Sequence, residues 1–311
     1  MTNVAGEAPA PDGDSGVSWS RTVPRELVHR TSVAEVLLTD VRPGPPGRFL
    51  AAACWPRSHS TFPVDGTGLH SPLLVVETLR QLGIYLPLRW YGVPTNSHML
   101  IDDLRFALLP GCEPQAGHGG TEVLCTVEAA DPRRRSDGSL ATLRLDVAYG
   151  AAGRIFARAR GGARFLSDER YAAVRGRRLG AGSFVAAPAE RPDLGVLGAS
   201  RPADVLVAFR DGALAIEPAD PRHPFYFDHV SDHVPGMVLL EAARQAAAQA
   251  SGGTLLRPVS GRMAASRFTE YDPPARVEAV PHHRTCVFRV RQGGVPTAYG
   301  VFGYGPAGEA P

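Results

Sequence analysis

The strongest hydrophobic pattern in the chain is the run HVPGMVLLEAARQAA, residues 233–247. Apolar side chains occupy nearly every face of the helix that this run predicts, so we expect the helix to be buried on most sides. Three polar residues interrupt the pattern at positions i, i+3 and i+4: Glu241, Arg244 and Gln245. Because an unpaired buried charge costs several kcal/mol, these side chains are expected to form a small polar cluster.

The same polar triplet occurs in a second apolar run. An offset of 164 positions aligns ETLRQ, residues 77–81, with EAARQ, residues 241–245, and it also aligns His59 with His223. Self-similarity at one offset is the signature of a duplicated structural unit. We therefore interpret the chain as two copies of one domain.

Each copy shows the same order of expected elements. A short alternating strand comes first, at residues 33–38 and 202–207, which align after a slip of about five residues. A loop rich in His, Pro and Gly follows, then the helix, then several β-rich segments. The β-rich segments are residues 98–108, 121–129 and 141–166 in the first copy, and residues 261–271, 275–280 and 284–305 in the second. One helix followed by an antiparallel sheet predicts an α+β tandem hotdog, in which each sheet wraps one central helix.

This interpretation divides the chain into four parts. We expect a loose tail at residues 1–20, a first hotdog domain at 21–166, a linker at 167–198 and a second hotdog domain at 199–305. The linker is the segment in which Arg, Gly and Pro are concentrated. Two fused copies supply a dimer within one chain, so we expect either a monomeric pseudo-dimer or a homodimer of it.

Composition narrows the class of protein. All 33 basic residues are arginine, but the net charge is only +2, which argues against nucleic acid as the main partner. The N-terminus has no apolar core, and no apolar run reaches 18 residues, so neither a signal peptide nor a membrane span is expected. The four cysteines lack metal spacing, and no dinucleotide or phosphate-loop motif occurs, so we expect a cytoplasmic protein with no metal and no cofactor.

Two families resemble the chain. HPFYFDHVSDHVPGMVLLEAARQAA, residues 223–247, resembles the active-site segment of β-hydroxyacyl-ACP dehydratases, although the interval from His229 to Pro235 is about two residues shorter. The whole chain is more similar to the A-factor biosynthesis hotdog family. The segments that carry this similarity are residues 27–40, 70–94, 232–247 and 266–279.

The second resemblance implies an acyltransferase. Its reaction joins a β-ketoacyl group from an acyl carrier protein to the hydroxyl of dihydroxyacetone phosphate, and the ester is the precursor of a γ-butyrolactone, butenolide or furan signalling molecule. Two alternatives stay open at this point. One is a dehydratase or thioesterase on the same fold, acting on acyl-ACP or acyl-CoA, and the other is a non-catalytic sensor that binds acyl chains.

Acid–base chemistry is assigned to the carboxylates of the two helices and to the segment before the second helix, residues 223–235, which we call the histidine loop. By analogy with hotdog dimers, His229 of the second copy is expected to face Glu77 of the first, while Asp65 is expected to face Glu241. We assign His229 as the base, with His233 as the second candidate. Because position 65 holds Asp where the other copy has His, only one of the two pseudo-sites has a His/Glu pair.

Substrate binding is assigned to the remaining polar residues of both helices. Arg80 or Arg244 is expected to hold a phosphate bidentately, and Gln81 and Gln245 are expected to line the pocket. Backbone N–H groups near Gly236, at the start of the second helix, are expected to hold the developing oxyanion. On an arbitrary helix, the Glu/Arg pairs would be ordinary i,i+3 ion pairs worth a few tenths of a kcal/mol.

Other polar residues carry weaker expectations. His59 and His223 are expected to be structural or to lie at the pocket rim, whereas His29 is left as either a strand anchor or a pocket residue. The arginine runs at residues 133–135 and 175–178 are expected to be solvated, with docking of an acidic acyl carrier protein as the alternative.

Overall fold

The computed structural model describes residues 16–180, 182–185 and 188–305. Residues 1–15 of the expected tail lie outside the described residues. The backbone N–H of Ser18, within the expected tail, donates to the Asp40 carboxylate at 3.1 Å. No helix in the described part of the chain is long and apolar enough to cross a membrane.

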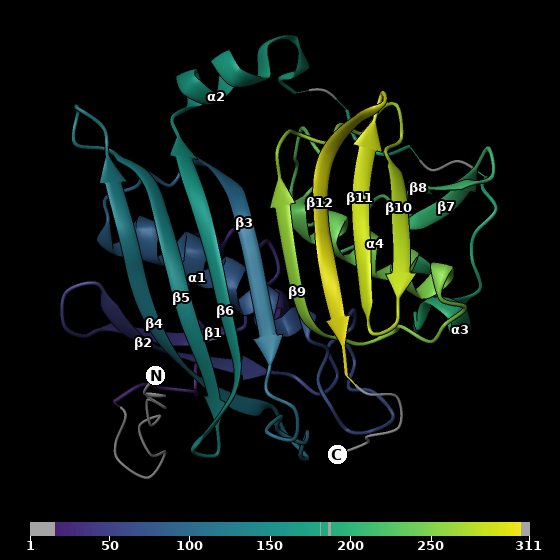
Figure 1. The fold of residues 1–311 in the computed structure, drawn as a ribbon. Coiled ribbons are helices and arrows are strands. Elements are labelled where there is room, and N and C mark those ends of the chain that lie inside the picture. Colours follow the sequence, from purple (N-terminus) through teal and green to yellow (C-terminus); the bar gives the residue numbers. More distant parts are fainter. Residues whose placement is uncertain (1–15, 181, 186–187, 306–311) are drawn as a thin grey trace, which may run out of the picture.

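A single twelve-stranded antiparallel sheet runs through the molecule, in the order β1-β2-β4-β5-β6-β3-β9-β12-β11-β10-β8-β7 (Figure 1). The first six strands are β1 Leu38–Pro43, β2 Arg48–Trp55, β3 His98–Leu108, β4 Thr121–Arg134, β5 Leu140–Ala151 and β6 Arg154–Leu166. The other six are β7 Val207–Arg210, β8 Ala213–Ile216, β9 Pro258–Ala265, β10 Arg276–His282, β11 Thr285–Gln292 and β12 Val295–Tyr304. Strands β3 and β9 pair at the centre, with Leu104 opposite Met263, and thereby join two half-sheets into one.

Each half-sheet carries one long helix. Helix α1 (Leu73–Trp90) packs against β5 and β6, and helix α4 (Gly236–Ala250) packs against β10 and β11 (Figure 1). Both helices are buried along almost their whole length, as their all-round apolar pattern predicts. This arrangement confirms the predicted α+β class and the tandem hotdog plan.

Short helices occupy the connections. They are η1 Arg25–Val28, η2 Val33–Glu35, α2 Asp168–Arg175, η3 Gly176–Arg178, α3 Leu194–Leu197 and η4 Pro202–Asp204. Helix α2 lies in the segment expected to be a linker, directly after β6, and its Ser167 N-cap accepts the backbone N–H of Arg170.

The strands expected at residues 33–38 and 202–207 are wrong for most of their length. The chain there forms the 3-10 turns η2 and η4, and strands begin only at Leu38 and Val207. The backbone N–H groups of Leu37 and Leu206 do not enter the sheet ladder, because each donates to a buried glutamine side chain from a helix. The short strands β2 and β8 were not expected from the sequence pattern.

Candidate functional site

A cavity of about 500 Å³ lies between the two halves of the chain. The first half contributes α1, β3, β5 and β6, and the second half contributes the loop that leads into α4. Its apolar wall includes Val76, Leu79, Leu143, Leu145, Phe165 and Met263. Its polar side includes His29, Arg80, His98, Asp228, His229 and His233. An apolar chamber with a few convergent polar groups is the usual form of a small-molecule site.

The imidazole of His229, in the histidine loop, is hydrogen-bonded to the buried carboxylate of Asp228. His229 Nδ1 lies 2.7 Å from Asp228 Oδ1, and the His229 side chain is half exposed whereas that of Asp228 is 3% exposed. Burial raises the pKa of Asp228, but the hydrogen bond from His229 and the charge of Arg30 outweigh it and hold the pKa below its usual value. Asp228 is therefore an ionised acceptor that fixes the His229 ring.

A second imidazole–carboxylate pair follows four residues later. His233 Nδ1 lies 2.8 Å from Asp232 Oδ1, while the Tyr171 hydroxyl donates to the same oxygen at 2.5 Å and Arg175 Nε donates to Oδ2 at 2.8 Å. Burial raises the pKa of Asp232, but these three partners lower it to about 2. Burial also lowers the pKa of His233, although Asp232 opposes that shift. His233 is thus a neutral imidazole near pH 7, with its proton held on Nδ1.

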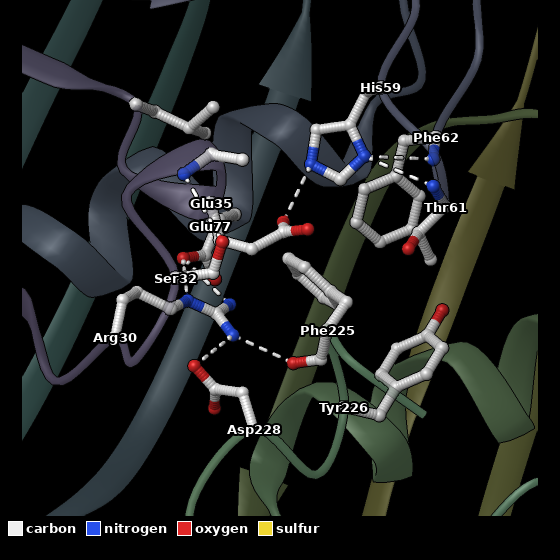
Figure 2. Close-up of polar contacts among 12 residues, drawn as sticks. Arg30, Ser32, Glu35, His59, Thr61, Phe62, Glu77, Phe225, Tyr226 and Asp228 are labelled. Carbon is white, nitrogen blue, oxygen red and sulfur yellow. Dashed lines mark hydrogen bonds and ion pairs between the residues drawn. The ribbon is translucent and has the colours of Figure 1, made fainter. Parts of the chain in front are cut away.

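The fully buried carboxylate of Glu77 lies at the centre of an ionic network, and Figure 2 shows its contact with Arg30. Its oxygens receive Arg30 Nη2 at 2.9 Å, Arg80 Nε at 2.8 Å and Gln81 Nε2 at 2.7 Å. Burial alone would raise the pKa of Glu77, but the two guanidinium groups lower it to about 2. A carboxylate held in this way stays ionised, and its side chain does not line the cavity. The geometry favours Glu77 as an anchor for two arginines and not as a proton acceptor.

The second helix carries the corresponding network, but its residues Glu241, Arg244 and Gln245 do not line the cavity between the halves. Glu241 receives Arg244 Nη2 at 2.6 Å and Gln245 Nε2 at 2.9 Å. Arg244 Nη1 donates to the backbone carbonyls of Leu197 and Leu256. The Arg244 guanidinium therefore donates through Nε, Nη1 and Nη2 to protein atoms, which argues against the phosphate role assigned to it as an alternative.

The two glutamines clamp the backbone. Gln81 Oε1 accepts the N–H of Leu37 at 2.9 Å, and Gln245 Oε1 accepts the N–H of Leu206 at 2.8 Å. Their amide nitrogens donate to the carbonyls of Glu35 and Asp204. Both amides are fully buried and do not line the cavity, so the geometry gives them a structural role in place of the expected substrate contact.

The expected facing pairs differ from the observed ones. The loop of His229 does meet helix α1 of the first half, but Arg30 lies between Asp228 and Glu77. Asp65 does not face Glu241. Its carboxylate accepts Thr67 and Leu69 backbone N–H groups and lies 3.5 Å from Arg257 Nε.

Arg80 and His29 supply the cationic and polar side of the cavity. Arg80 uses Nε and Nη2 on Glu77 and on the Val28 carbonyl, whereas its Nη1 has no hydrogen-bond partner among the described residues. Burial, with the nearby charge of Arg80, lowers the pKa of His29 to about 4, so this imidazole is neutral. Gly236 also lines the cavity, at the first turn of α4.

His59 and His223 are structural, as one of the two interpretations held. Each accepts two backbone N–H groups at Nδ1, and each presents Nε2 to an acid, at 3.2 Å for Glu35 and 2.9 Å for Asp204 (Figure 2 shows the His59 pair). The two halves repeat this arrangement with different acids, and only the pair of His223 with Asp204 meets the geometry of a hydrogen bond.

Several residues of the site were not singled out from the sequence. They are Arg30, Asp228, Asp232 and Tyr171, whereas Arg175 was expected to be solvated with the rest of the run at residues 175–178 and is instead buried, with its guanidinium on Asp232 and Glu270. A signal for two of them was available, because DHVSDHV repeats the dipeptide Asp-His at an interval of four residues. Within the described residues, no group of three or more His, Cys, Asp or Glu side chains is arranged to hold a metal ion.

Comparison with known proteins places the chain in a family. The model of the A-factor biosynthesis hotdog domain matches residues 15–167 and 198–266. A 2-oxo-3-(phosphooxy)propyl 3-oxoalkanoate synthase of Streptomyces virginiae is 39% identical over 266 residues, covering 84% of this chain and 87% of the relative. A synthase of the same name from Streptomyces griseus is 34% identical over 278 residues, covering 88% of this chain and 86% of the relative.

A solved structure supports the fold. An acyl-ACP thioesterase from Bacteroides thetaiotaomicron superimposes with a TM-score of 0.50 at 12% identity, covering 83% of this chain and 97% of the thioesterase. The length of the family match and the two Streptomyces relatives lead to one conclusion. The chain belongs to the A-factor biosynthesis hotdog family and is an acyltransferase-type enzyme.

Proposed function

We propose that this protein transfers a β-ketoacyl group from the thioester of an acyl carrier protein to the hydroxyl of dihydroxyacetone phosphate. The observation that carries the proposal is the cavity between the halves, which combines an apolar wall, carboxylate-bound imidazoles and a guanidinium group. The relatives' name describes a 3-oxoalkanoate ester that bears a phosphooxy group. Such an ester is the precursor that a butyrolactone, butenolide or furan signalling molecule requires.

His229 acts as the base in this proposal. Its Nε2 takes the hydroxyl proton as the substrate oxygen attacks the thioester carbon, and Asp228 holds Nδ1 throughout. The C–O bond forms, the C–S bond breaks, and the leaving thiolate takes the proton from the imidazolium. The N-terminal N–H groups of α4, from Gly236 onward, stabilise the oxyanion because a helix N-terminus favours negative charge.

Arg80 binds the phosphate of the acceptor. Its side chain is 15% exposed and lines the cavity, and its Nη1 has no partner among the described residues. Glu77 holds the other edge of the guanidinium in place, so the arginine is already oriented before the substrate arrives. This preorganisation is the proposed purpose of the buried Glu77.

The acyl carrier protein docks beside the cavity opening. Arg177 and Arg178 are exposed, and they directly precede Leu179, which lines the cavity and is 50% exposed. Positive charge next to an apolar edge complements an acidic carrier that delivers its acyl chain into the cavity.

The proposal is tested by incubating the purified protein with a β-ketoacyl-ACP, or a thioester mimic, and dihydroxyacetone phosphate. Mass spectrometry then follows the products. A phosphorylated ester or its dehydrated cyclic product is expected. Thioester loss that is equally fast without dihydroxyacetone phosphate identifies a thioesterase or dehydratase, and binding with no turnover identifies an acyl-binding sensor.

A further inference from the structure

One arginine links the two halves of the chain at the cavity. Arg30 precedes η2 in the first half, and its side chain is 3% exposed. Its Nη2 lies 2.9 Å from Glu77 Oε1 on α1, and its Nη1 donates to the Phe225 carbonyl at 2.7 Å and lies 3.4 Å from Asp228 Oδ2. The guanidinium also stacks over the Phe225 ring at 4.2 Å (Figure 2). Three of these contacts reach the histidine loop of the other half.

We propose that Arg30 is the positioning residue that holds the Asp228–His229 pair in its working geometry. This inference rests on the proposed function, since it assumes that His229 is the base. Arg30 belongs to no part of the reacting chemistry, because its Nε, Nη1 and Nη2 all donate to protein atoms. It differs in this respect from Arg80, which keeps Nη1 available.

The charges around Asp228 explain the need for an arginine. The Asp228 side chain is 3% exposed, and a buried carboxylate without a cation takes up a proton or turns toward water. The groups that face it are Arg30, His229 and His29, together with the backbone N–H of Thr31 at 3.2 Å. Arg30 is the permanently charged member of this set, and Glu77 fixes Arg30 from the opposite side.

Among the described residues, no arginine joins Glu241 of the second half to the loop of the first half, since Arg257 reaches Asp65 and the His70 carbonyl but does not contact Glu241. The slip that aligns Glu35 with Asp204 places Ala199 opposite Arg30. The arginine nearest in sequence, Arg201, pairs with Asp204 of its own half at 2.6 Å, and its side chain is 45% exposed. Within the described residues, an arginine therefore joins a long helix to the loop of the other half only at Arg30, which contacts Glu77 of α1 and Asp228 beside the cavity.

Arg30→Met and Arg30→Lys test the proposal in the full-length protein, with Arg201→Met as the matched control. We expect R30M to lower kcat about 10- to 100-fold, the range that misplacing a catalytic group produces, with KM for the thioester within about twofold. R30K restores part of the rate, and added methylguanidinium restores part of the rate of Arg30→Gly. R201M keeps the wild-type kcat. Wild-type kcat in R30M, or equal losses in R30M and R201M, would overturn the proposal.

The pH profile separates positioning from simple loss of structure. Because Arg30 helps to hold the pKa of Asp228 down, R30M is expected to lose activity at a higher pH than wild type on acidification. An unmoved acid limb in a folded R30M contradicts the proposal, and a melting curve verifies folding. If wild type only hydrolyses the thioester, the transferase proposal fails, and the same variants are compared on that hydrolysis. A transferase whose R30M variant is unimpaired refutes the Arg30 role alone.

Discussion

The two long helices carry the same Glu-x-x-Arg-Gln triplet, yet the triplets have different surroundings. On α1, Glu77 binds two arginines, and one of them, Arg80, lines the cavity and has no hydrogen-bond partner at Nη1 among the described residues. On α4, Glu241 binds one arginine, Arg244, and the Nη1 of that guanidinium donates to backbone carbonyls. Both copies of the motif therefore keep the structural role of the glutamine, which hydrogen-bonds the backbone of the preceding turn. The catalytic environment depends on what the other copy brings to it.

The largest expected effect concerns the histidine loop. H229Q should lower kcat about 10²–10⁴-fold, the usual contribution of a general base. H233Q should cost at least tenfold less, since Tyr171 and Arg175 already tie its partner Asp232 into a structural network. Initial rates of ester formation by mass spectrometry decide between them. A larger loss in H233Q would move the base to His233.

E77Q and E241Q compare the two triplets directly. Removing one partner of a buried ion pair costs about 3–5 kcal/mol, so E77Q should be strongly destabilised and should lose transfer activity. E241Q should cost less, about 1–3 kcal/mol, because Arg244 keeps two backbone acceptors, and it should retain activity. Urea unfolding and rate measurements on both variants test this difference. Equal losses of activity would mean that both pseudo-sites work.

Acidification probes the same network. The pKa of Glu77 is about 2 in the folded protein and 4.5 when unperturbed, so its stabilisation is fully present above pH 4.5. It is lost as the pH falls from about 4.5 toward 2, and it amounts to something on the order of 3 kcal/mol. Urea midpoints of wild type should fall through this window, whereas those of E77Q should fall less. Parallel curves would show that Glu77 is not the group responsible.

Replacing Arg80 and replacing Arg244 should have different effects, because we assign substrate binding to the first and a structural role to the second. R80M should raise KM for dihydroxyacetone phosphate about tenfold or more, because it removes a charged hydrogen bond to the phosphate. R244M should lower the melting temperature and leave that KM unchanged. Steady-state kinetics with the acceptor varied is the measurement, and an unchanged KM in R80M would place the phosphate elsewhere.

The smallest expected effect lies at the surface. A double charge reversal, R177E with R178E, should raise KM for a carrier-bound donor several-fold, more at low salt than at high salt. KM for a small thioester mimic should not change. The control is R284E with R289E, which alters the same charge at exposed positions outside the cavity. Similar shifts in both doubles would remove the docking assignment.

Much of this architecture is readable in the sequence. The 164-residue offset, the two all-round apolar helices and the β-rich segments specify a tandem α+β hotdog, because burial on every face forces a helix to be wrapped. The position of His229 ahead of Pro235-Gly236 marks the histidine loop. The turns at η2 and η4 escaped prediction because side chains of Gln81 and Gln245, over 35 residues away, take the N–H groups that a strand would use.

Only the tertiary structure decided which copy of the triplet serves the cavity. The contacts that matter join residues far apart in the chain, such as Arg30 with Asp228 and Tyr171 with Asp232. Local pattern carries no information on such pairs, since a Glu/Arg pair at i,i+3 has the same spacing on a scaffold helix and on a site helix. The sequence determined two equivalent helices. Packing the halves together made them different, because one helix received Arg30 and the histidine loop and the other did not.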